Sequence, residues 1–254
     1  SSKYSKDFEK LAKKNTRVIY LESPSSLKYD VQDLDKFIRF SRCKKITTIM
    51  DNTWSTFYGC NPLKLGNDIV IESATKYFSG HSDCFCGLIA CNKKHYNEVF
   101  STKVRYGDFV SSENCFLAIR GLKTLPIRLK THFKNAIKLH DYMKKSGLFT
   151  KILYPAVIEH KNYNIWKKYH SIGNGLITFE IKFKKKPIEI FIDSLKFFKL
   201  GFSWGGFESL ILPISQQNEG SEKINGYWFR IHVGLENYQD LIEDINQALT
   251  KYFK

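Results

Sequence analysis

Residues 46–54 read ITTIMDNTW, and residues 68–76 read DIVIESATK. In each stretch a short apolar run rich in β-branched residues leads into polar residues, at Asp51 in the first and at Ser73 in the second. Runs of this length and composition are typical of buried strands in a mainly parallel sheet. The two stretches therefore predict an α/β fold in which polar side chains gather at neighbouring strand ends.

Asp51 supplies a carboxylate at the end of the first apolar run, and Lys76 supplies an amine three residues after Ser73. A pyridoxal phosphate site requires this pair, because the amine condenses with the cofactor aldehyde and the carboxylate keeps the pyridine nitrogen protonated. The hydroxyls of Ser73 and Thr75, close to the lysine, would donate hydrogen bonds to the phosphate. A lone lysine is more often a solvated surface charge, and a lone aspartate a turn or cap residue. The chemistry of the residues therefore leaves both interpretations open.

The composition limits the class of protein. A chain of 254 residues with 43% hydrophobic residues is long enough for one large domain or two smaller ones. No run approaches the ~18 apolar residues of a membrane helix, and the N-terminus has no apolar signal core. We therefore expect a cytoplasmic protein without a membrane partner. Because the first residue is not Met, we also expect a processed, trimmed or incomplete polypeptide.

The six cysteines include no Cys-x-x-Cys pair. His81, Cys84 and Cys86 lie close together, but no second pair of ligands follows at the spacing of a zinc finger. We therefore expect reduced, mostly buried cysteines and no metal site.

The net charge of +15 raises the possibility of an anionic partner such as nucleic acid. Only 7 of the 40 basic residues are arginine, and the lysines are scattered along the chain. No zinc finger, helix-turn-helix or RNA-binding aromatic motif accompanies them. We therefore expect no nucleic-acid partner and attribute the charge to a composition rich in lysine.

Hydrophobic periodicity divides the chain in two. In the first part strand and helix patterns alternate, with strands expected at residues 17–22, 46–50, 68–71 and 86–91 and helices at residues 31–38 and 112–143. In the second part strands are expected at residues 175–181, 210–212 and 229–232 and helices at residues 187–197 and from residue 238 onward. We therefore predict a large cofactor-binding domain, itself partial, over residues 1–150 and a smaller C-terminal α+β domain over residues 151–254.

Several short motifs occur in a fixed order: residues 22–24 (ESP), 51–54 (DNTW), 73–77 (SATKY), 80–83 (GHSD), 120–125 (RGLKTL), 203–209 (SWGGFES) and 230–236 (RIHVGLE). By these motifs the chain, from about Arg17 to its C-terminus, resembles the cysteine/methionine-metabolism (trans-sulfuration) family of pyridoxal-phosphate-dependent enzymes, most closely its cystathionine β-lyase branch. The resemblance implies the type I fold of pyridoxal-phosphate transferases, with a mainly parallel sheet and flanking helices. It also implies pyridoxal 5′-phosphate as cofactor and a homotetramer built as a dimer of dimers.

The same resemblance assigns roles to the strand-end residues. Lys76 would be the catalytic residue, bonding to the cofactor and later moving protons. Asp51 would pair with the pyridine nitrogen, while Ser73 and Thr75 would hold the phosphate.

Substrate contacts are implied at Arg230, Ser203 and Trp204. Arg230 would bind the α-carboxylate of an amino-acid substrate, since a planar guanidinium suits bidentate recognition. Taken alone, residues 203–206 are only a turn with an aromatic residue. They are not a phosphate loop, because the Gly-Lys-Ser/Thr ending is absent.

The reaction implied is β-elimination of L-cystathionine to homocysteine, pyruvate and ammonia, a step of methionine biosynthesis. Trp204 favours this branch, because γ-acting relatives (cystathionine γ-lyase and γ-synthase) usually carry a smaller residue there. Family members also carry a segment ahead of the strand at Arg17 that completes the phosphate site and stacks on the cofactor ring, and this segment has no counterpart here. Two alternatives therefore stay open: a catalytically impaired remnant of the family, and a basic binding protein on the same scaffold. We expect exposed apolar surface where that segment packs.

Overall fold

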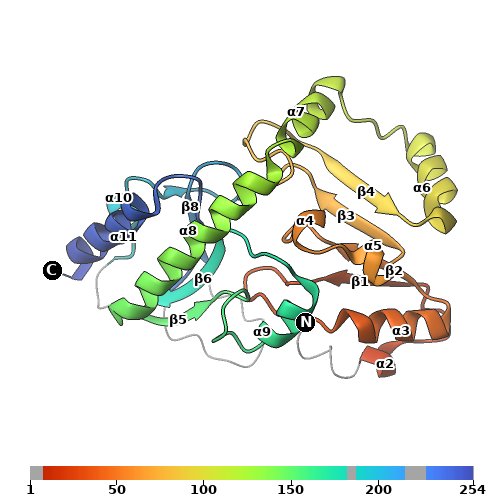
Figure 1. Ribbon diagram of the computed structural model, residues 1–254, viewed down its shortest axis with the longest axis horizontal. Coiled ribbons are helices and arrows are strands. Elements are labelled where there is room, and N and C mark those ends of the chain that lie inside the picture. The colour runs from red at the N-terminus through yellow and green to blue at the C-terminus, as the bar shows by residue number, and fades with distance from the viewer. Residues whose placement is uncertain (1–7, 182–186, 215–226, 254) are drawn as a thin grey trace.

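A computed structural model describes residues 8–181, 187–214 and 227–253, and two β-sheets organise them (Figure 1). The first sheet has the order β1-β2-β3-β4. Its strands are β1 (Val18–Glu22), β2 (Thr47–Asp51), β3 (Ile69–Ser73) and β4 (Gly87–Cys91). β1, β2 and β3 are parallel, whereas β4 runs antiparallel to β3. The parallel register places Glu22 beside Asp51, so the carboxyl ends of β1 and β2 meet at one edge.

The second sheet has the order β5-β6-β9-β8-β7. Its strands are β5 (Phe149–Leu153), β6 (Leu176–Ile181), β7 (Lys199–Leu200), β8 (Leu210–Ile214) and β9 (Tyr227–His232). All neighbours in it are antiparallel except β7 and β8. Mixed sheets with flanking helices confirm the predicted α/β class, while the parallel pattern is limited to β1–β3 and the β7–β8 pair.

The helices lie around these sheets (Figure 1). They are α2 (Phe8–Leu11), α3 (Leu34–Lys44), α4 (Thr56–Gly59), α5 (Pro62–Leu65), α6 (Lys93–Tyr106), α7 (Ser112–Leu122), α8 (Leu125–Ser146), α9 (Tyr163–Tyr169), α10 (Glu189–Ser194) and α11 (Tyr238–Phe253). The single helical region expected at residues 112–143 is two helices, α7 and α8. A proline in the first turn of α8 explains the break, because it suits a helix start and disfavours helix in the residue before it. No described helix is long and apolar enough to cross a membrane.

The largest hydrophobic core lies at the second sheet. Phe179 and Phe229 stack with ring centroids 5.4 Å apart, and Leu139 of α8 packs into the same cluster. Tyr29 and Trp54, from loops that follow β1 and β2, join this cluster as well. α8 also contacts β5, β6 and α11, so a helix from the predicted first domain, residues 1–150, covers the second sheet. The division at residue 150 into two domains stays a prediction.

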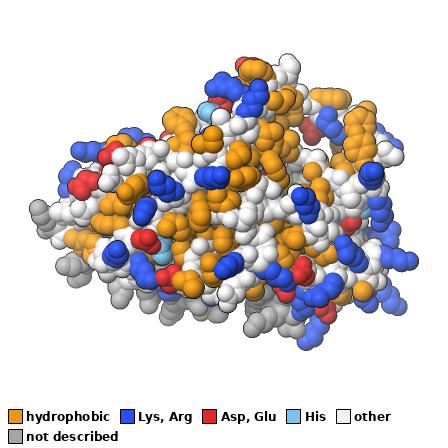
Figure 2. Space-filling model, viewed as in Figure 1, with side chains coloured by type: hydrophobic (Ala, Val, Ile, Leu, Met, Phe, Trp, Pro, Cys, Tyr) orange, Lys and Arg blue, Asp and Glu red, His pale blue; other side chains and the backbone are white. Residues whose placement is uncertain are grey.

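One face of the first sheet lacks cover among the described residues. On that face Val18, Tyr20 and Ile89 are 48%, 56% and 60% exposed, and Ile49 and Ile71 are only half-buried. On the opposite face Leu21, Met50 and Val70 are buried. Figure 2 shows further apolar side chains gathered at the surface over α6 and α7. The prediction of buried strands is therefore right for one face and wrong for the other.

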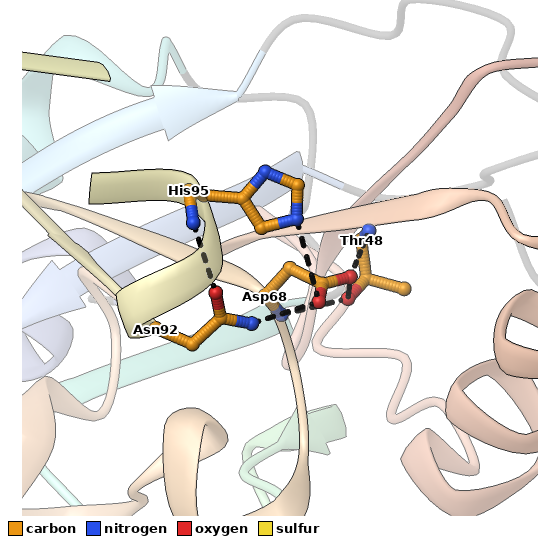
Figure 3. Close-up of polar contacts among 4 residues, drawn as sticks. All are labelled: Thr48, Asp68, Asn92 and His95. Atoms are coloured by element: carbon orange, nitrogen blue, oxygen red, sulfur yellow. Dashed lines mark hydrogen bonds and ion pairs between the residues drawn. The ribbon is translucent and has the colours of Figure 1, made fainter. Parts of the chain in front are cut away.

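A cluster of polar side chains stabilises this sheet at the amino ends of β2 and β3 (Figure 3). Asp68 Oδ2 accepts hydrogen bonds from the backbone N–H and the hydroxyl of Thr48, at 2.9 and 3.1 Å. Asp68 Oδ1 accepts from Asn92 Nδ2 at 2.9 Å and lies 3.7 Å from His95 Nε2. Asn92 also caps α6, since its side-chain oxygen accepts from the His95 N–H. One carboxylate thus joins β2, the start of β3 and α6.

Replacing Asp68 with alanine is expected to destabilise the fold. The donors of Thr48 and Asn92 would lose a partly buried, charged acceptor, which costs about 2–4 kcal/mol of unfolding free energy. Urea denaturation of the parent and the variant measures this. Asp108→Ala, at an exposed position just after α6, is the control and should stay within about 0.5 kcal/mol. Equal effects of the two substitutions would contradict the role given to Asp68.

Candidate functional site

The carboxyl ends of β1, β2 and β3 open onto a cavity of about 220 Å³. It is lined by Glu22, Ser26, Leu27, Tyr29, Asp51, Thr53, Trp54, Ser73, Lys76, Leu176, Trp204 and Arg230. Of the residues singled out in the sequence, Asp51, Ser73, Lys76, Trp204 and Arg230 therefore meet at one place. They come from both sheets and from the loop after β7.

Lys76 lies in the turn that follows β3. Its Nζ donates a hydrogen bond to Ser203 Oγ at 2.7 Å and lies 5.3 Å from the centroid of the Trp204 ring. Burial lowers the pKa of Lys76, and the positive charge of Arg230 lowers it further. A lowered pKa increases the fraction of unprotonated amine, which is the nucleophilic form.

Two contacts hold the lysine turn in place. Arg128 of α8 is buried, and its guanidinium donates to the Tyr77 and Gly121 carbonyls at 2.8 Å each. From the other side the backbone of Gly205 approaches so closely that an added Cβ would lie 2.7 Å from the Tyr77 nitrogen. Gly205 also has a φ of +89°, which favours glycine. This close approach is what brings Ser203 and Trp204 next to Lys76.

Asp51 is held by the loop that follows it. Its Oδ1 accepts from the Thr53 N–H at 2.9 Å, and Thr53 Oγ1 accepts from the Ser73 N–H at 2.8 Å. Tyr20 of β1 donates to the Asp51 carboxylate, and the pKa of Tyr20 is raised first by burial and then by that carboxylate. The same causes, burial first, raise the pKa of Glu22. Asp51 is therefore fixed at the cavity by neighbours on both adjacent strands.

The two hydroxyls assigned to the phosphate are placed differently. Ser73 lines the cavity. Thr75 does not, and its Oγ1 accepts from the Cys86 N–H at 3.0 Å. The hydroxyl of Thr75 thus holds the lysine turn against Cys86, the residue before β4. The role of Thr75 toward a phosphate stays a prediction.

Arg230 of β9 is buried beside the cavity. Its Nη2 donates to the carbonyls of Phe202 and Ser203, the latter at 3.2 Å, so the guanidinium also holds the loop that carries the partner of Lys76. Burial lowers the pKa of Arg230, which remains far above neutrality for a guanidinium. Arg230 therefore brings a fixed positive charge to the cavity.

Sequence reasoning missed several residues of the cavity wall. Tyr29 is the clearest case, because its side chain is buried against Trp54 with ring centroids 6.3 Å apart. It lies in a loop with a φ of +52°, and no periodicity marks such a position. Glu22 and Trp54 lie in two of the motifs found in the sequence, at residues 22–24 and 51–54. The sequence assigned neither residue a role.

These residues fit pyridoxal phosphate. An amine with a lowered pKa and a carboxylate fixed by neighbouring hydrogen bonds line one cavity, and the cavity also holds a buried guanidinium. Nε of that guanidinium has no hydrogen-bond partner among the described residues, which suits an anionic ligand group. Among the described residues no group of three His, Cys, Asp or Glu side chains is arranged to hold a metal ion.

Glu72, next to Ser73 in β3, is a buried carboxyl behind this wall. Its Oε1 accepts from Asn52 Nδ2 at 2.9 Å, and Asn52 follows Asp51 in the chain. Burial is the main cause that raises the pKa of Glu72 to about 7. The hydrogen bonds from Asn52 and from the Phe57 backbone oppose the rise, and the charge of Asp51 adds to it. Glu72 therefore changes charge near neutral pH, beside the loop that holds Asp51.

The raised pKa predicts a pH-dependent stability. The folded state binds this proton more tightly than the unfolded state, whose glutamate pKa is ~4.3. The stabilising contribution is therefore fully present below about pH 4.3 and is lost as the pH rises to about 7. In Glu72→Gln the side chain cannot ionise, so the variant does not lose stability through this group as the pH rises. The unfolding free energy of the variant minus that of the parent should therefore increase by about 1–3 kcal/mol between pH 4.5 and pH 8.

Denaturant titration of both proteins at the two pH values makes the measurement. Glu113→Gln, at an exposed position in the first turn of α7, provides the matched control and should show a difference that does not vary with pH. A difference between Glu72→Gln and the parent that is the same at both pH values would show that Glu72 does not titrate in this range.

Comparisons with known proteins identify the family of this chain. The family described as Cys/Met metabolism PLP-dependent enzyme matches residues 2–250. The chain is 33% identical over 251 residues to the L-alanine/L-glutamate racemase of Wolbachia pipientis wMel. It is 34% identical over 254 residues to the cystathionine beta-lyase of Lactococcus lactis subsp. cremoris (strain MG1363). The crystal structure of cystathionine gamma-lyase from Lactobacillus plantarum complexed with L-serine superposes with a TM-score of 0.89 at 28% identity, covering 97% of this chain.

The lengths differ between the chain and these relatives. The match takes in 96% of this chain but 62% of the racemase, and 67% each of the Lactococcus lyase and of the crystallised lyase. The names of the relatives cover β-lysis, γ-lysis and racemisation, which share the cofactor but not the reaction. The chain belongs to the Cys/Met metabolism family of PLP-dependent enzymes, which confirms the family and the cofactor predicted from its sequence.

Proposed function

We propose that this chain provides the catalytic residues of a carbon–sulfur lyase that cleaves L-cystathionine by β-elimination to homocysteine, pyruvate and ammonia. The observation that carries the proposal is the meeting of Lys76, Asp51 and Arg230 at one cavity. An amine, a carboxylate and a guanidinium so placed suit a cofactor–amino-acid pair better than a nucleic acid. The basic residues that do not line the cavity have no role in this proposal.

Each residue has a separate task in the proposal. Pyridoxal phosphate, when bound, supplies an electron sink for the electrons left at the substrate Cα. Lys76 Nζ holds the cofactor and then takes the proton from that Cα, for which its lowered pKa suits it. Asp51 keeps the pyridine nitrogen protonated, and Ser73 donates to the phosphate. Arg230 binds the substrate α-carboxylate as a bidentate donor.

Ser203 and Trp204 act on Lys76 itself in this proposal. Ser203 Oγ accepts the lysine hydrogen bond and so directs Nζ into the cavity. Trp204 lies over Nζ and forms one wall with Trp54 and Tyr29 nearby. A large ring at this wall supports β-elimination, because it shortens the space available to a substrate side chain. A γ-acting lyase is the alternative, supported by the likeness to the Lactobacillus structure.

Product analysis tests the reaction. The purified protein, supplied with pyridoxal phosphate and L-cystathionine, should release pyruvate and homocysteine in equal amounts. Release of 2-oxobutyrate and cysteine would favour γ-elimination, and racemised L-alanine without cleavage would favour the chemistry named for the Wolbachia relative. Bound cofactor without any product would favour a catalytically impaired member of the family. The homotetramer and the cytoplasmic location stay predictions, to be measured by light scattering and by fractionation.

A further inference from the structure

Two carboxylates lie side by side in the wall of the cavity. Glu22 and Asp51 are register partners at the carboxyl ends of the parallel strands β1 and β2, and both line the cavity. The charge of Asp51 contributes to the raised pKa of Glu22, after burial as the larger cause, so the two groups are close enough to repel one another. The fold therefore delivers a second acid to the place where Asp51 lies.

The hydrogen-bond donors to this pair, within the described residues, are neutral groups. The Thr53 N–H and the Tyr20 hydroxyl donate to Asp51, and the Ser26 N–H donates to Glu22. In the part of the chain that the structure describes, neither carboxylate forms an ion pair with a lysine, arginine or histidine. Adjacent like charges without a counter-charge are unfavourable, so the pair favours a ligand group that is positively charged.

The positive charges that line the cavity have other contacts. Lys76 Nζ donates to the Ser203 hydroxyl at 2.7 Å, and Arg230 Nη2 donates to backbone carbonyls of the loop after β7. A ligand that balances the charges of this cavity therefore carries a positive group toward the two acids and a negative group toward the guanidinium. A protonated pyridine nitrogen is a positive group of the size and flatness that pyridoxal phosphate provides.

We propose that Glu22 is a positioning residue that acts through Asp51. Its carboxylate places a second negative charge next to the one that faces the ring nitrogen of pyridoxal phosphate, and this charge favours the protonated nitrogen over the neutral one. The proposal rests on the proposed function in one respect, the pairing of Asp51 with the ring nitrogen. It makes the charge of Glu22, rather than its shape, the property that the site uses.

Two ligands that differ in the ring nitrogen test the proposal. Pyridoxine 5′-phosphate has the nitrogen and the phosphate but no aldehyde, so it binds without bonding to Lys76. Benzyl phosphate keeps a six-membered aromatic ring and the phosphate but lacks the nitrogen. Each ligand would be titrated into the purified protein while tryptophan fluorescence is followed, since Trp54 and Trp204 line the cavity.

Two substitutions of the same residue separate charge from shape. Glu22→Gln removes the charge and keeps the size of the side chain and an acceptor for the Ser26 N–H. This variant should bind pyridoxine 5′-phosphate about 5-fold more weakly, a modest loss because solvent reaches Glu22 and screens its charge. Its affinity for benzyl phosphate should not fall. Glu22→Asp keeps the charge in a shorter side chain and should stay within about 2-fold of the parent for both ligands.

The opposite order of the two variants would overturn the proposal. If Glu22→Gln binds pyridoxine 5′-phosphate as the parent does and Glu22→Asp binds it more weakly, the side chain has a role of shape alone. Equal weakening of both ligands in Glu22→Gln would trace to the fold and not to the ring nitrogen, which overturns it as well. Glu113→Gln, exposed in the first turn of α7, removes the same charge far from the cavity lining and should change neither affinity.

Asp51→Asn separates this proposal from the proposed function. It should weaken the binding of pyridoxine 5′-phosphate at least as much as Glu22→Gln does. A loss in Asp51→Asn but not in Glu22→Gln would refute the role of Glu22 and keep that of Asp51. No loss in either variant would refute both roles. A loss in both variants, in a protein that releases no pyruvate from L-cystathionine, would keep the role of Glu22 and refute the lyase.

Discussion

Lys76→Ala is expected to abolish covalent capture of pyridoxal phosphate and to reduce turnover of L-cystathionine by at least ~10³-fold. The reason is that one amine serves both to bond the cofactor and to move the proton at Cα. Among the residues that the structure describes, no other lysine lines the cavity. The visible absorption band of the lysine-bound cofactor, followed as pyridoxal phosphate is added, gives the first measurement, and pyruvate release gives the second.

The control for this variant is another lysine in the same chain. Lys93, an exposed residue at the start of α6, would be replaced by alanine and should leave both readouts unchanged. A band of equal strength in Lys76→Ala would show that the cofactor bonds elsewhere on this lysine-rich surface. A lost band with retained folding, checked by circular dichroism, is the expected pattern, since within the described part of the chain the Lys76 side chain makes a single hydrogen bond, to Ser203.

Arg230→Lys is expected to raise KM for the substrate by about 30–100-fold. Hydrogen bonds to charged groups contribute ~1.5–3 kcal/mol, and lysine cannot reproduce the planar fork. The guanidinium also holds the Phe202 and Ser203 carbonyls, so the partner of Lys76 would shift and kcat would fall as well. Steady-state kinetics at saturating cofactor separates the two effects.

Arg105→Lys supplies the control for this substitution. Arg105 is exposed near the end of α6, and its replacement should change neither KM nor kcat. An unaltered KM in Arg230→Lys, with the fold intact, would show that a different group binds the substrate carboxylate. A fall in kcat alone would leave Arg230 as a residue that positions the 202–203 loop.

The elements that sequence could predict are those with a local signal. The apolar runs that lead to Asp51 and Ser73 located β2 and β3 to within two residues, because strand patterns end where polar residues begin. The resemblance then named Lys76, Asp51 and Arg230, and the structure brings the three to one cavity. Arg230 is far from the others in sequence, and no periodicity in the chain would have joined them.

The misses have physical causes as well. Tyr29 enters the site through a loop residue with a positive φ, and such a conformation has no periodic signature. The burial of Ile49 and Ile71 was overestimated for a different reason. A run of apolar residues predicts a strand, but it does not reveal whether both faces of the sheet are covered.

The bare face of the first sheet also affects how the protein behaves in concentrated solution. Val18, Tyr20 and Ile89 present apolar area there, and such a face attracts other apolar surfaces in water. The net charge of +15 opposes this attraction, because like-charged copies repel one another. Salt shortens the range of that repulsion from about 10 Å at 0.1 M to about 3 Å at 1 M ionic strength. Raising the salt concentration will therefore promote self-association of this chain, where for a covered sheet it would have little effect.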